Sequence, residues 1–186
     1  MTDFKKRLAE LLLALSYREG DFTLTSGKKS DYYFDCKQTA LHPEGGYLIG
    51  RIFVEMLKKY DVTGVGGMTL GADPLVTGVT VVSHIEGRPM PGFIIRKKSK
   101  GHGTNQYLEG LANFDQGDRV VLLEDVCTTG GTLITAAERV RYAGLEIAGV
   151  LAVLDREEGG RERLKEAGLE LDAIFTRKEL LAAGGR

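Results

Sequence analysis

The sequence has few of the residues that join protein segments covalently or through a metal ion. Its 186 residues include two cysteines and three histidines. Two cysteines do not make a disulfide framework, so Cys36 and Cys127 are expected to be free thiols in a reducing compartment. His42, His84 and His102 show no metal-ligand spacing with one another or with the cysteines. The sequence therefore indicates neither a disulfide scaffold nor a structural zinc site.

Long apolar runs and an excess of one charge are also absent. No apolar stretch approaches the ~20 residues that cross a membrane. The formal net charge of -1 does not favour a general nucleic-acid binder. At the N-terminus, "MTDFKKRLAELLLAL" places charges among apolar residues at helical spacing, as in an amphipathic helix rather than a signal peptide. We therefore predict a soluble, cytoplasmic protein that binds neither membranes nor nucleic acid.

The length and composition suit one globular domain over residues 1–186, with 42% hydrophobic and 27% charged residues. From residue 62 onward, patterns of strand and helix alternate. This alternation favours an α/β fold with an open, mostly parallel sheet and helices on both faces. Before it, "GDFTLTSGKKSDYYFDCKQ" predicts a β-hairpin. Residues 1–40 are expected to form a small subdomain over one edge of the sheet.

One stretch, "VVLLEDVCTTGGT" at residues 120–132, combines a buried strand, two acids and a Gly/Thr loop. We expect the strand to cover residues 120–123, with Glu124 and Asp125 at its carboxyl end, where parallel sheets bind ligands. The loop leads into a helix expected to start near Leu133, and the N–H groups of a helix N-terminus bind phosphate. Carboxylates repel phosphate but suit a ribose diol or a hydrated Mg²⁺. The stretch thus predicts a ribose 5-phosphate site. The alternative is an ordinary turn, with glycine for its geometry and threonine as helix cap.

The same stretch resembles the phosphoribosyl-diphosphate-binding motif of the type I phosphoribosyltransferases. Three others, "TSGKKSDYYFD", "RKKSKGHGTNQYLEG" and "LDREEGG", make the chain similar to the orotate phosphoribosyltransferases of that family. The resemblance covers nearly the full chain. It implies transfer of phosphoribosyl from 5-phosphoribosyl 1-diphosphate to orotate with Mg²⁺, releasing pyrophosphate and giving orotidine 5′-phosphate for pyrimidine (UMP) biosynthesis. It also implies a hood, formed by residues 1–40, over the base.

The resemblance assigns the phosphoribosyl diphosphate to two segments. In the first, Arg96, Lys97, Lys100 and His102 are matched to the diphosphate, whereas Lys98 is not singled out. The second is the Gly/Thr loop with its acids: Glu124, Asp125, Val126, Cys127, Thr128, Thr129, Gly130, Gly131 and Thr132. Catalytic roles fall on Lys100, His102 and Asp125. The alternative for the first segment is a solvated charged loop, as most charge runs are.

Four residues are matched to the orotate base. A guanidinium holds a carboxylate with two parallel hydrogen bonds, and the resemblance gives Arg156 that role toward orotate. It also places Thr128, Tyr33 and Phe34 at the base. The alternatives are a surface Arg156 paired with Glu157 or Glu158, and core packing of half of the aromatic run, because strand side chains alternate between faces.

The chain departs from the family pattern at three places. Thr25 stands where some members have lysine, and whether Lys28 or Lys29 replaces it stays open. Leu70 and Gly71 stand where many members have a Tyr-Lys pair, which removes a diphosphate contact. The first acid is Glu124, where many relatives have aspartate. Mg²⁺ is expected to be held mainly by substrate, with Asp73 or Asp125 as the candidate side chains.

The resemblance further implies a homodimer in which the loop at residues 97–106 closes over the neighbouring subunit's site. Two other functions are weighed against the orotate enzyme. A purine phosphoribosyltransferase would not need Arg156, because purines carry no carboxylate. A regulator that senses phosphoribosyl diphosphate would need a basic face or an added DNA-binding region, and the sequence has neither.

Overall fold

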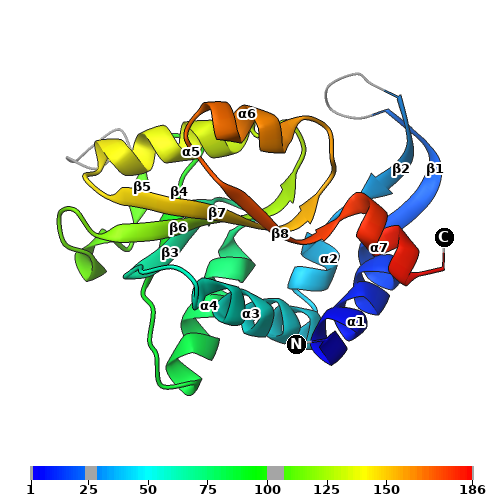
Figure 1. Cartoon of the computed structure of the whole chain (residues 1–186), viewed down its shortest axis with the longest axis horizontal. Coiled ribbons are helices and arrows are strands. Elements are labelled where there is room, and N and C mark those ends of the chain that lie inside the picture. Colours follow the sequence, from blue (N-terminus) through cyan, green and yellow to red (C-terminus); the bar gives the residue numbers. More distant parts are fainter. Residues whose placement is uncertain (1, 24–28, 100–106, 186) are drawn as a thin grey trace.

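A six-stranded sheet forms the centre of the molecule, in the computed structural model that describes residues 2–23, 29–99 and 107–185 (Figure 1). The strand order is β5-β4-β3-β6-β7-β8. Every neighbouring pair is parallel except β4 and β5. The strands are β3 (Gly64–Met68), β4 (Gly92–Ile95), β5 (Leu108–Glu109), β6 (Arg119–Cys127), β7 (Glu146–Asp155) and β8 (Leu171–Thr176). This is the open, mostly parallel sheet that the sequence predicted.

The order of the strands reverses between β3 and β6. From β3 the chain crosses through α4 (Asp73–Ile85) to β4 on one side. From β6 it crosses through α5 (Gly131–Tyr142) to β7, and then through α6 (Gly160–Glu166) to β8, on the other side. A crevice opens at the carboxyl ends of two strands where the order reverses. The fold therefore places its ligand site beyond the ends of β3 and β6.

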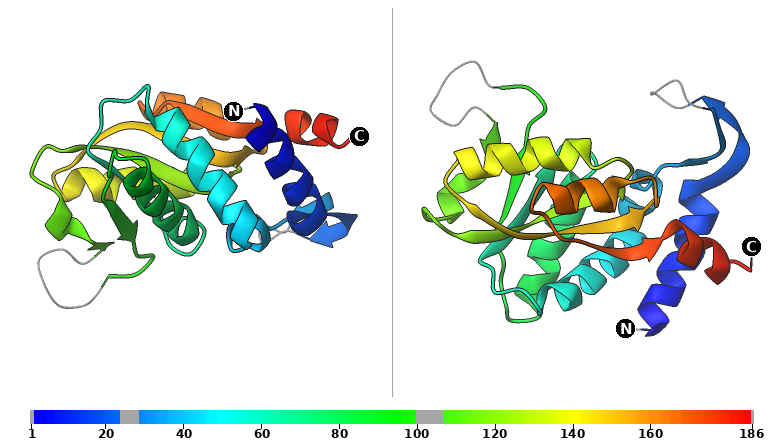
Figure 2. Two further views of the ribbon diagram at one scale, coloured as in Figure 1. Left: turned by 90° about the horizontal axis from the view of Figure 1, so that it is seen from below. Right: turned by 45° about the horizontal axis from the view of Figure 1, so that its top comes forward.

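Helices cover both faces of the sheet. The helices α3 (Pro43–Leu57) and α4 lie side by side over one face, and α5 and α6 lie over the other (Figures 1 and 2). The alternation along β6 serves both layers: Val121 and Leu123 join the core beneath α3 and α4, and Val120 and Leu122 join the core beneath α5. A strand buried on both faces needs a continuous apolar run, as this stretch has.

The N-terminal part of the chain stands at the carboxyl-end edge of the sheet. Helix α1 (Thr2–Leu11) continues as one π-helical segment (Leu12–Ser16), followed by the antiparallel strands β1 (Tyr17–Thr23) and β2 (Lys29–Phe34) and the short helix α2 (Lys37–Ala40). The C-terminal helix α7 (Arg177–Ala183) contacts α1 (Figure 1). The predicted hairpin is confirmed, and Figure 2 shows it projecting beyond the sheet.

Two boundaries differ from the prediction. The strand expected to end at residue 123 continues to Cys127, because β7 is long enough to keep pairing with it through Leu154 and Asp155. Helix α5 begins at Gly131 rather than near Leu133, directly after Gly130 in the left-handed conformation (φ 74°). Within the described ranges, the helices are too short or too polar to cross a bilayer.

Candidate active site

A pocket of about 370 Å³ lies where the strand order reverses. Its wall comes from the turn after β3, from the end of β6 and from the loop that follows. The lining residues are Lys37, 68–71, Lys97 and 124–133. The Thr69–Leu70 peptide bond in this wall is cis. The nine residues 124–132, which the sequence assigned to phosphoribosyl diphosphate, thus share one pocket.

The loop between β6 and α5 presents a helix N-terminus to this pocket. Gly130 precedes the helix at φ 74°, and no side chain in the described part of the chain caps the first turn. A β-carbon on Gly130 would lie 3.0 Å from Leu164 Cγ and 3.1 Å from the Gly160 carbonyl oxygen, so both conformation and space favour glycine. The uncapped N–H groups and the neighbouring threonine hydroxyls supply donors for a phosphate.

The two acids stand beside this loop in the last part of β6. Glu124 is 7% exposed, and its Oε1 accepts a hydrogen bond from the Asp125 N–H at 3.2 Å. Asp125 Oδ1 accepts one from the Val126 N–H at 2.9 Å. Burial, together with the neighbouring Asp125 carboxyl, raises the pKa of Glu124 well above its ordinary value. Glu124 therefore holds its proton to higher pH than an exposed glutamate does.

This raised pKa makes stability depend on pH. The proton on Glu124 stabilises the folded state fully below the unfolded pKa, about 4.3. That stabilisation is lost as the pH rises through the folded pKa. Glu124→Gln keeps a hydrogen-bonding group but does not titrate. We expect its melting temperature to rise relative to that of the wild type as the pH increases above about 4, because only the wild type must ionise Glu124.

Thermal unfolding measured at a series of pH values above about 4 checks this expectation. The control is Glu138→Gln, which makes the same substitution at an exposed residue of α5. A margin for Glu124→Gln that stays constant with pH would show that Glu124 titrates alike in the folded and unfolded chains.

Lys37 lines the pocket although the sequence did not single it out. It begins α2, and its Nζ lies 2.6 Å from Asp35 Oδ1 and 4.0 Å from Asp125 Oδ2. The available signal was a lysine near the end of the stretch that predicted the hairpin. That signal was insufficient because the sequence does not fix where the hairpin meets the sheet.

The cationic segment after β4 is described at its two ends. Lys97 lines the pocket, whereas Arg96 pairs with Glu109 at 3.1 Å and lines a separate hollow. Arg139 of α5 fixes both ends: it donates to the Arg96 carbonyl at 2.6 Å and stacks on the Tyr107 ring at 4.2 Å. Lys100 and His102 lie outside the described residues, as do Thr25 and Lys28.

Arg156 follows β7 and lies beside the phosphate loop, where its N–H donates to the Cys127 carbonyl at 3.0 Å. Its side chain is 10% exposed, pairs with Glu158 at 2.8 Å and packs on the Tyr32 ring at 4.7 Å. Arg156 thus makes one of the alternative ion pairs, yet it is buried against the hairpin rather than at the surface.

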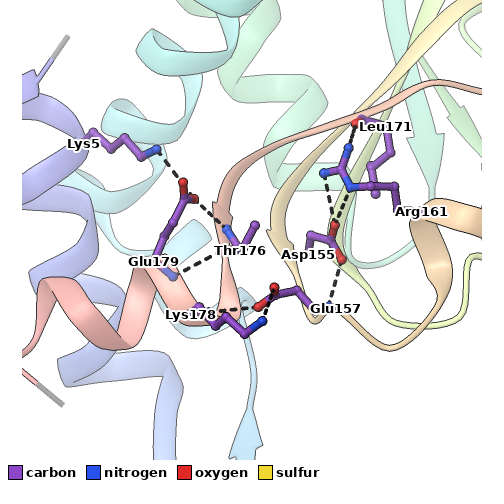
Figure 3. Close-up of polar contacts among 8 residues, drawn as sticks. All are labelled: Lys5, Asp155, Glu157, Arg161, Leu171, Thr176, Lys178 and Glu179. Carbon is purple, nitrogen blue, oxygen red and sulfur yellow. Dashed lines mark hydrogen bonds and ion pairs between the residues drawn. The ribbon is translucent and has the colours of Figure 1, made fainter.

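The residues before and after Arg156, Asp155 and Glu157, are both held by polar contacts (Figure 3). Asp155, 2% exposed, accepts from the Glu157 N–H at 2.9 Å and from Arg161 Nε at 3.1 Å. Arg161 also donates to the Leu171 carbonyl, and Glu157 pairs with Lys178 at 3.3 Å. Strand β8 and the start of α7 therefore hold the backbone around Arg156.

The two aromatic candidates for the base point in different directions. Phe34 is 8% exposed and belongs to the core, whereas Tyr33 is 45% exposed and packs near Phe22. Of the described residues, the pocket wall itself includes Thr128 but not Arg156, Tyr33 or Phe34. One of the four base candidates, Thr128, therefore belongs to the pocket, while Tyr33 and Phe34 belong to strand β2 of the hairpin.

Comparison with known proteins gives one consistent family. The phosphoribosyl transferase domain matches residues 74–171. An orotate phosphoribosyltransferase of Nostoc sp. is 47% identical over 180 residues, which cover 97% of this chain and 86% of that protein. Two crystal structures of Mycobacterium tuberculosis orotate phosphoribosyltransferase cover 95% of this chain and 98% of theirs. The complex with Fe(III) dicitrate has a TM-score of 0.84 at 38% identity, and the complex with 5-phospho-α-D-ribosyl 1-diphosphate has 0.79 at 35%.

Proposed function

Because the chain belongs to the orotate phosphoribosyltransferase family, we propose that its pocket joins orotate to the ribose of 5-phosphoribosyl 1-diphosphate. In this reaction a nitrogen of orotate forms a bond to C1 while the bond from C1 to the diphosphate oxygen breaks. The products are orotidine 5′-phosphate and pyrophosphate. The observation that carries the assignment is the shared pocket of an uncapped helix N-terminus and an acidic pair, with a buried arginine next to it.

The geometry of the pocket supports one orientation of the bound phosphoribosyl diphosphate. The 5′-phosphate binds at residues 128–132, where the donors of α5 converge. The ribose hydroxyls then lie at Glu124 and Asp125. Positive charge that develops on the ribose at the transition state faces Asp125, and negative charge on the leaving diphosphate faces Lys97. Lys100 and His102 keep the catalytic roles that the family resemblance implies.

Mg²⁺ is proposed as the cofactor, and the residues present suit a metal carried in by the substrate. Among the described residues, no group of three or more His, Cys, Asp or Glu side chains forms a metal site. Asp125 would hold the ion as one carboxylate ligand. Thr69 donates to Asp73 Oδ2 at 2.9 Å, and Asp73 Oδ1 is buried with no hydrogen-bond partner among the described residues. Asp73 lines a neighbouring groove and not the pocket, so Asp125 is the better placed of the two candidate carboxylates. When bound, Mg²⁺ neutralises charge on the diphosphate.

Orotate is placed between the phosphate loop and the hairpin. Arg156 binds its carboxylate in exchange for Glu158, Thr128 reaches the base, and Tyr33 contributes the exposed aromatic face. Residues 1–40 then act as a hood, consistent with the contacts that Arg156 and Arg177 make with Tyr32. Both cysteines are free and buried, which fits the reducing cytoplasm that we propose as its location.

A base panel tests this function. The protein is incubated with phosphoribosyl diphosphate and Mg²⁺, and nucleotide formation is followed for orotate, uracil, adenine and hypoxanthine. We expect product with orotate. Product with adenine or hypoxanthine instead would identify a purine enzyme. Binding of phosphoribosyl diphosphate without any transfer would identify a sensor.

Arg156→Ala in the same panel tests the base assignment. Loss of a charge-assisted hydrogen bond costs about 1.5–3 kcal/mol, so the KM for orotate is expected to rise by one to two orders of magnitude. The KM for phosphoribosyl diphosphate should change little. Arg141→Ala is the matched control, because Arg141 is exposed in the last turn of α5, at the end of that helix away from the phosphate loop. Unchanged orotate kinetics in Arg156→Ala would remove Arg156 from the base site.

An apolar groove of about 760 Å³ adjoins the pocket and is proposed as the face of a homodimer. It lies between α2, α3 and α4, and Lys37 and Leu70 line both the groove and the pocket. Its large exposed apolar side chains are Leu41, Tyr47, Leu70, Val81 and Ile85. A two-fold contact on this face brings the neighbouring subunit beside the pocket, which suits a loop at 97–106 that acts on the partner. Lys97 lines the pocket of its own chain. In this proposal, the part of the loop that acts on the neighbouring subunit therefore begins after Lys97.

A further inference from the structure

The described wall of the pocket carries few positive charges for a site that binds a diphosphate. The described wall contains two acidic side chains, Glu124 and Asp125, and two basic ones, Lys37 and Lys97. The Asp125 carboxylate repels a diphosphate, whereas the two ammonium groups attract it. Of the two, only Lys97 is accounted for by the family resemblance.

The turn after β3 lies on this wall without adding a cation. It presents Leu70 and Gly71 to the pocket. A β-carbon at position 71 would lie 2.6 Å from Asp125 Oδ1 and 2.7 Å from its Cγ. Any side chain at position 71 would therefore displace the Asp125 carboxylate. A positive charge on this side of the pocket has to come from another element.

Lys37 reaches this side of the pocket from the end of the hairpin. Asp35 holds its ammonium, and Asp35 itself accepts hydrogen bonds from the Lys37 N–H and from Gln38 Nε2, each at 3.2 Å. The hydrogen bond that the Lys37 ammonium donates to the Asp35 carboxylate raises the pKa of Lys37, which keeps it charged. The side chain is still 41% exposed, so the ammonium can turn to a ligand while its charge stays at the pocket.

We propose that Lys37 is a further substrate-binding residue, whose ammonium binds the diphosphate of phosphoribosyl diphosphate on the side of Leu70 and Gly71. This role rests on the proposed function of the pocket. It adds a cation at the position where the chain has lost the one that many relatives carry. A competing role is that Lys37 acts only through Asp125, 4.0 Å away, and so affects the ribose hydroxyls rather than the diphosphate.

Binding of two fragments of the substrate separates these roles. Inorganic pyrophosphate carries the diphosphate without the ribose, and ribose 5-phosphate carries the ribose without the diphosphate. Calorimetry with each, in the presence of Mg²⁺, is compared for the wild type, Lys37→Ala, Lys37→Arg and Lys58→Ala. Lys58 is an exposed lysine at the end of α3 and serves as control. Melting temperatures establish that each variant folds.

For Lys37→Ala we expect pyrophosphate binding and the KM for phosphoribosyl diphosphate to weaken by about ten- to a hundredfold. Ribose 5-phosphate binding and the KM for orotate should stay within about twofold of the wild type, and Lys37→Arg should recover most of the loss. The proposal is overturned if pyrophosphate binds equally well to Lys37→Ala, or if ribose 5-phosphate binding falls instead. If the wild type binds pyrophosphate but joins no base to the ribose, the proposed function is refuted. The comparison of pyrophosphate binding between the wild type and Lys37→Ala still tests the role of Lys37.

Discussion

Asp125→Asn is expected to lower kcat by about two orders of magnitude, which is the usual scale when one preorganised electrostatic contact to a transition state is lost. The side chain keeps its shape, and the hydrogen bond from the Val126 N–H can still be accepted by the amide oxygen. What is removed is the negative charge that, in the proposed function, faces the ribose as it becomes cationic. The loss should therefore exceed any change in the free energy of unfolding.

Steady-state kinetics and thermal unfolding of the same preparation check this result. Asp115→Asn, at an exposed aspartate before the start of β6 and so at the opposite end of that strand from the pocket, removes the same charge and should leave kcat unchanged. If Asp125→Asn keeps full kcat, the acidic pair does not serve the ribose.

A mixture of two inactive variants is expected to recover about a quarter of wild-type activity, because random pairing makes half of the dimers mixed and each of these has one intact site. The variants are Lys100→Ala, which damages the loop, and Asp125→Asn, which damages the pocket. They are unfolded together and refolded. In a mixed dimer, the Lys100→Ala chain keeps a sound pocket and receives a sound loop from its partner.

The control mixture combines Lys100→Ala with His102→Ala. Both lesions then lie in the loop, so every pocket receives one damaged loop and activity should stay at the level of the separate variants. Absence of recovery in the first mixture would show that each loop serves its own subunit. The same samples, run by analytical ultracentrifugation, report whether the chain is a dimer.

The sheet and the phosphate loop could be predicted because their signals are local. The run from Val120 to Leu123 is apolar at every position, which only a strand buried on both faces requires, and the structure buries it between two helix layers. Likewise, Gly130 and the threonines around it follow that strand directly, so their place at its carboxyl end follows from the order of the chain.

The base side of the site was harder to predict because it depends on contacts between distant segments. The choice between Tyr33 and Phe34 depends on the face that β2 turns to the core, and an aromatic run is compatible with either face. Arg156 pairs with Glu158, yet its burial comes from Tyr32, more than a hundred residues earlier. Arg96 turns to Glu109 because of the short strand β5, which the sequence did not predict.

The close approach of Gly71 to Asp125 also restricts how this enzyme could change through single mutations. A lysine placed at position 71 would push the Asp125 carboxylate out of its place, so that step would cost activity before the new cation contributed anything. If Lys37 is lost first, the diphosphate loses its cation on this side of the pocket. If Lys37 binds the diphosphate as proposed, the two arrangements of positive charge are thus separated by less active intermediates. A lineage would pass between them only after the backbone of the turn had moved, which makes positions 37, 71 and 125 an epistatic set.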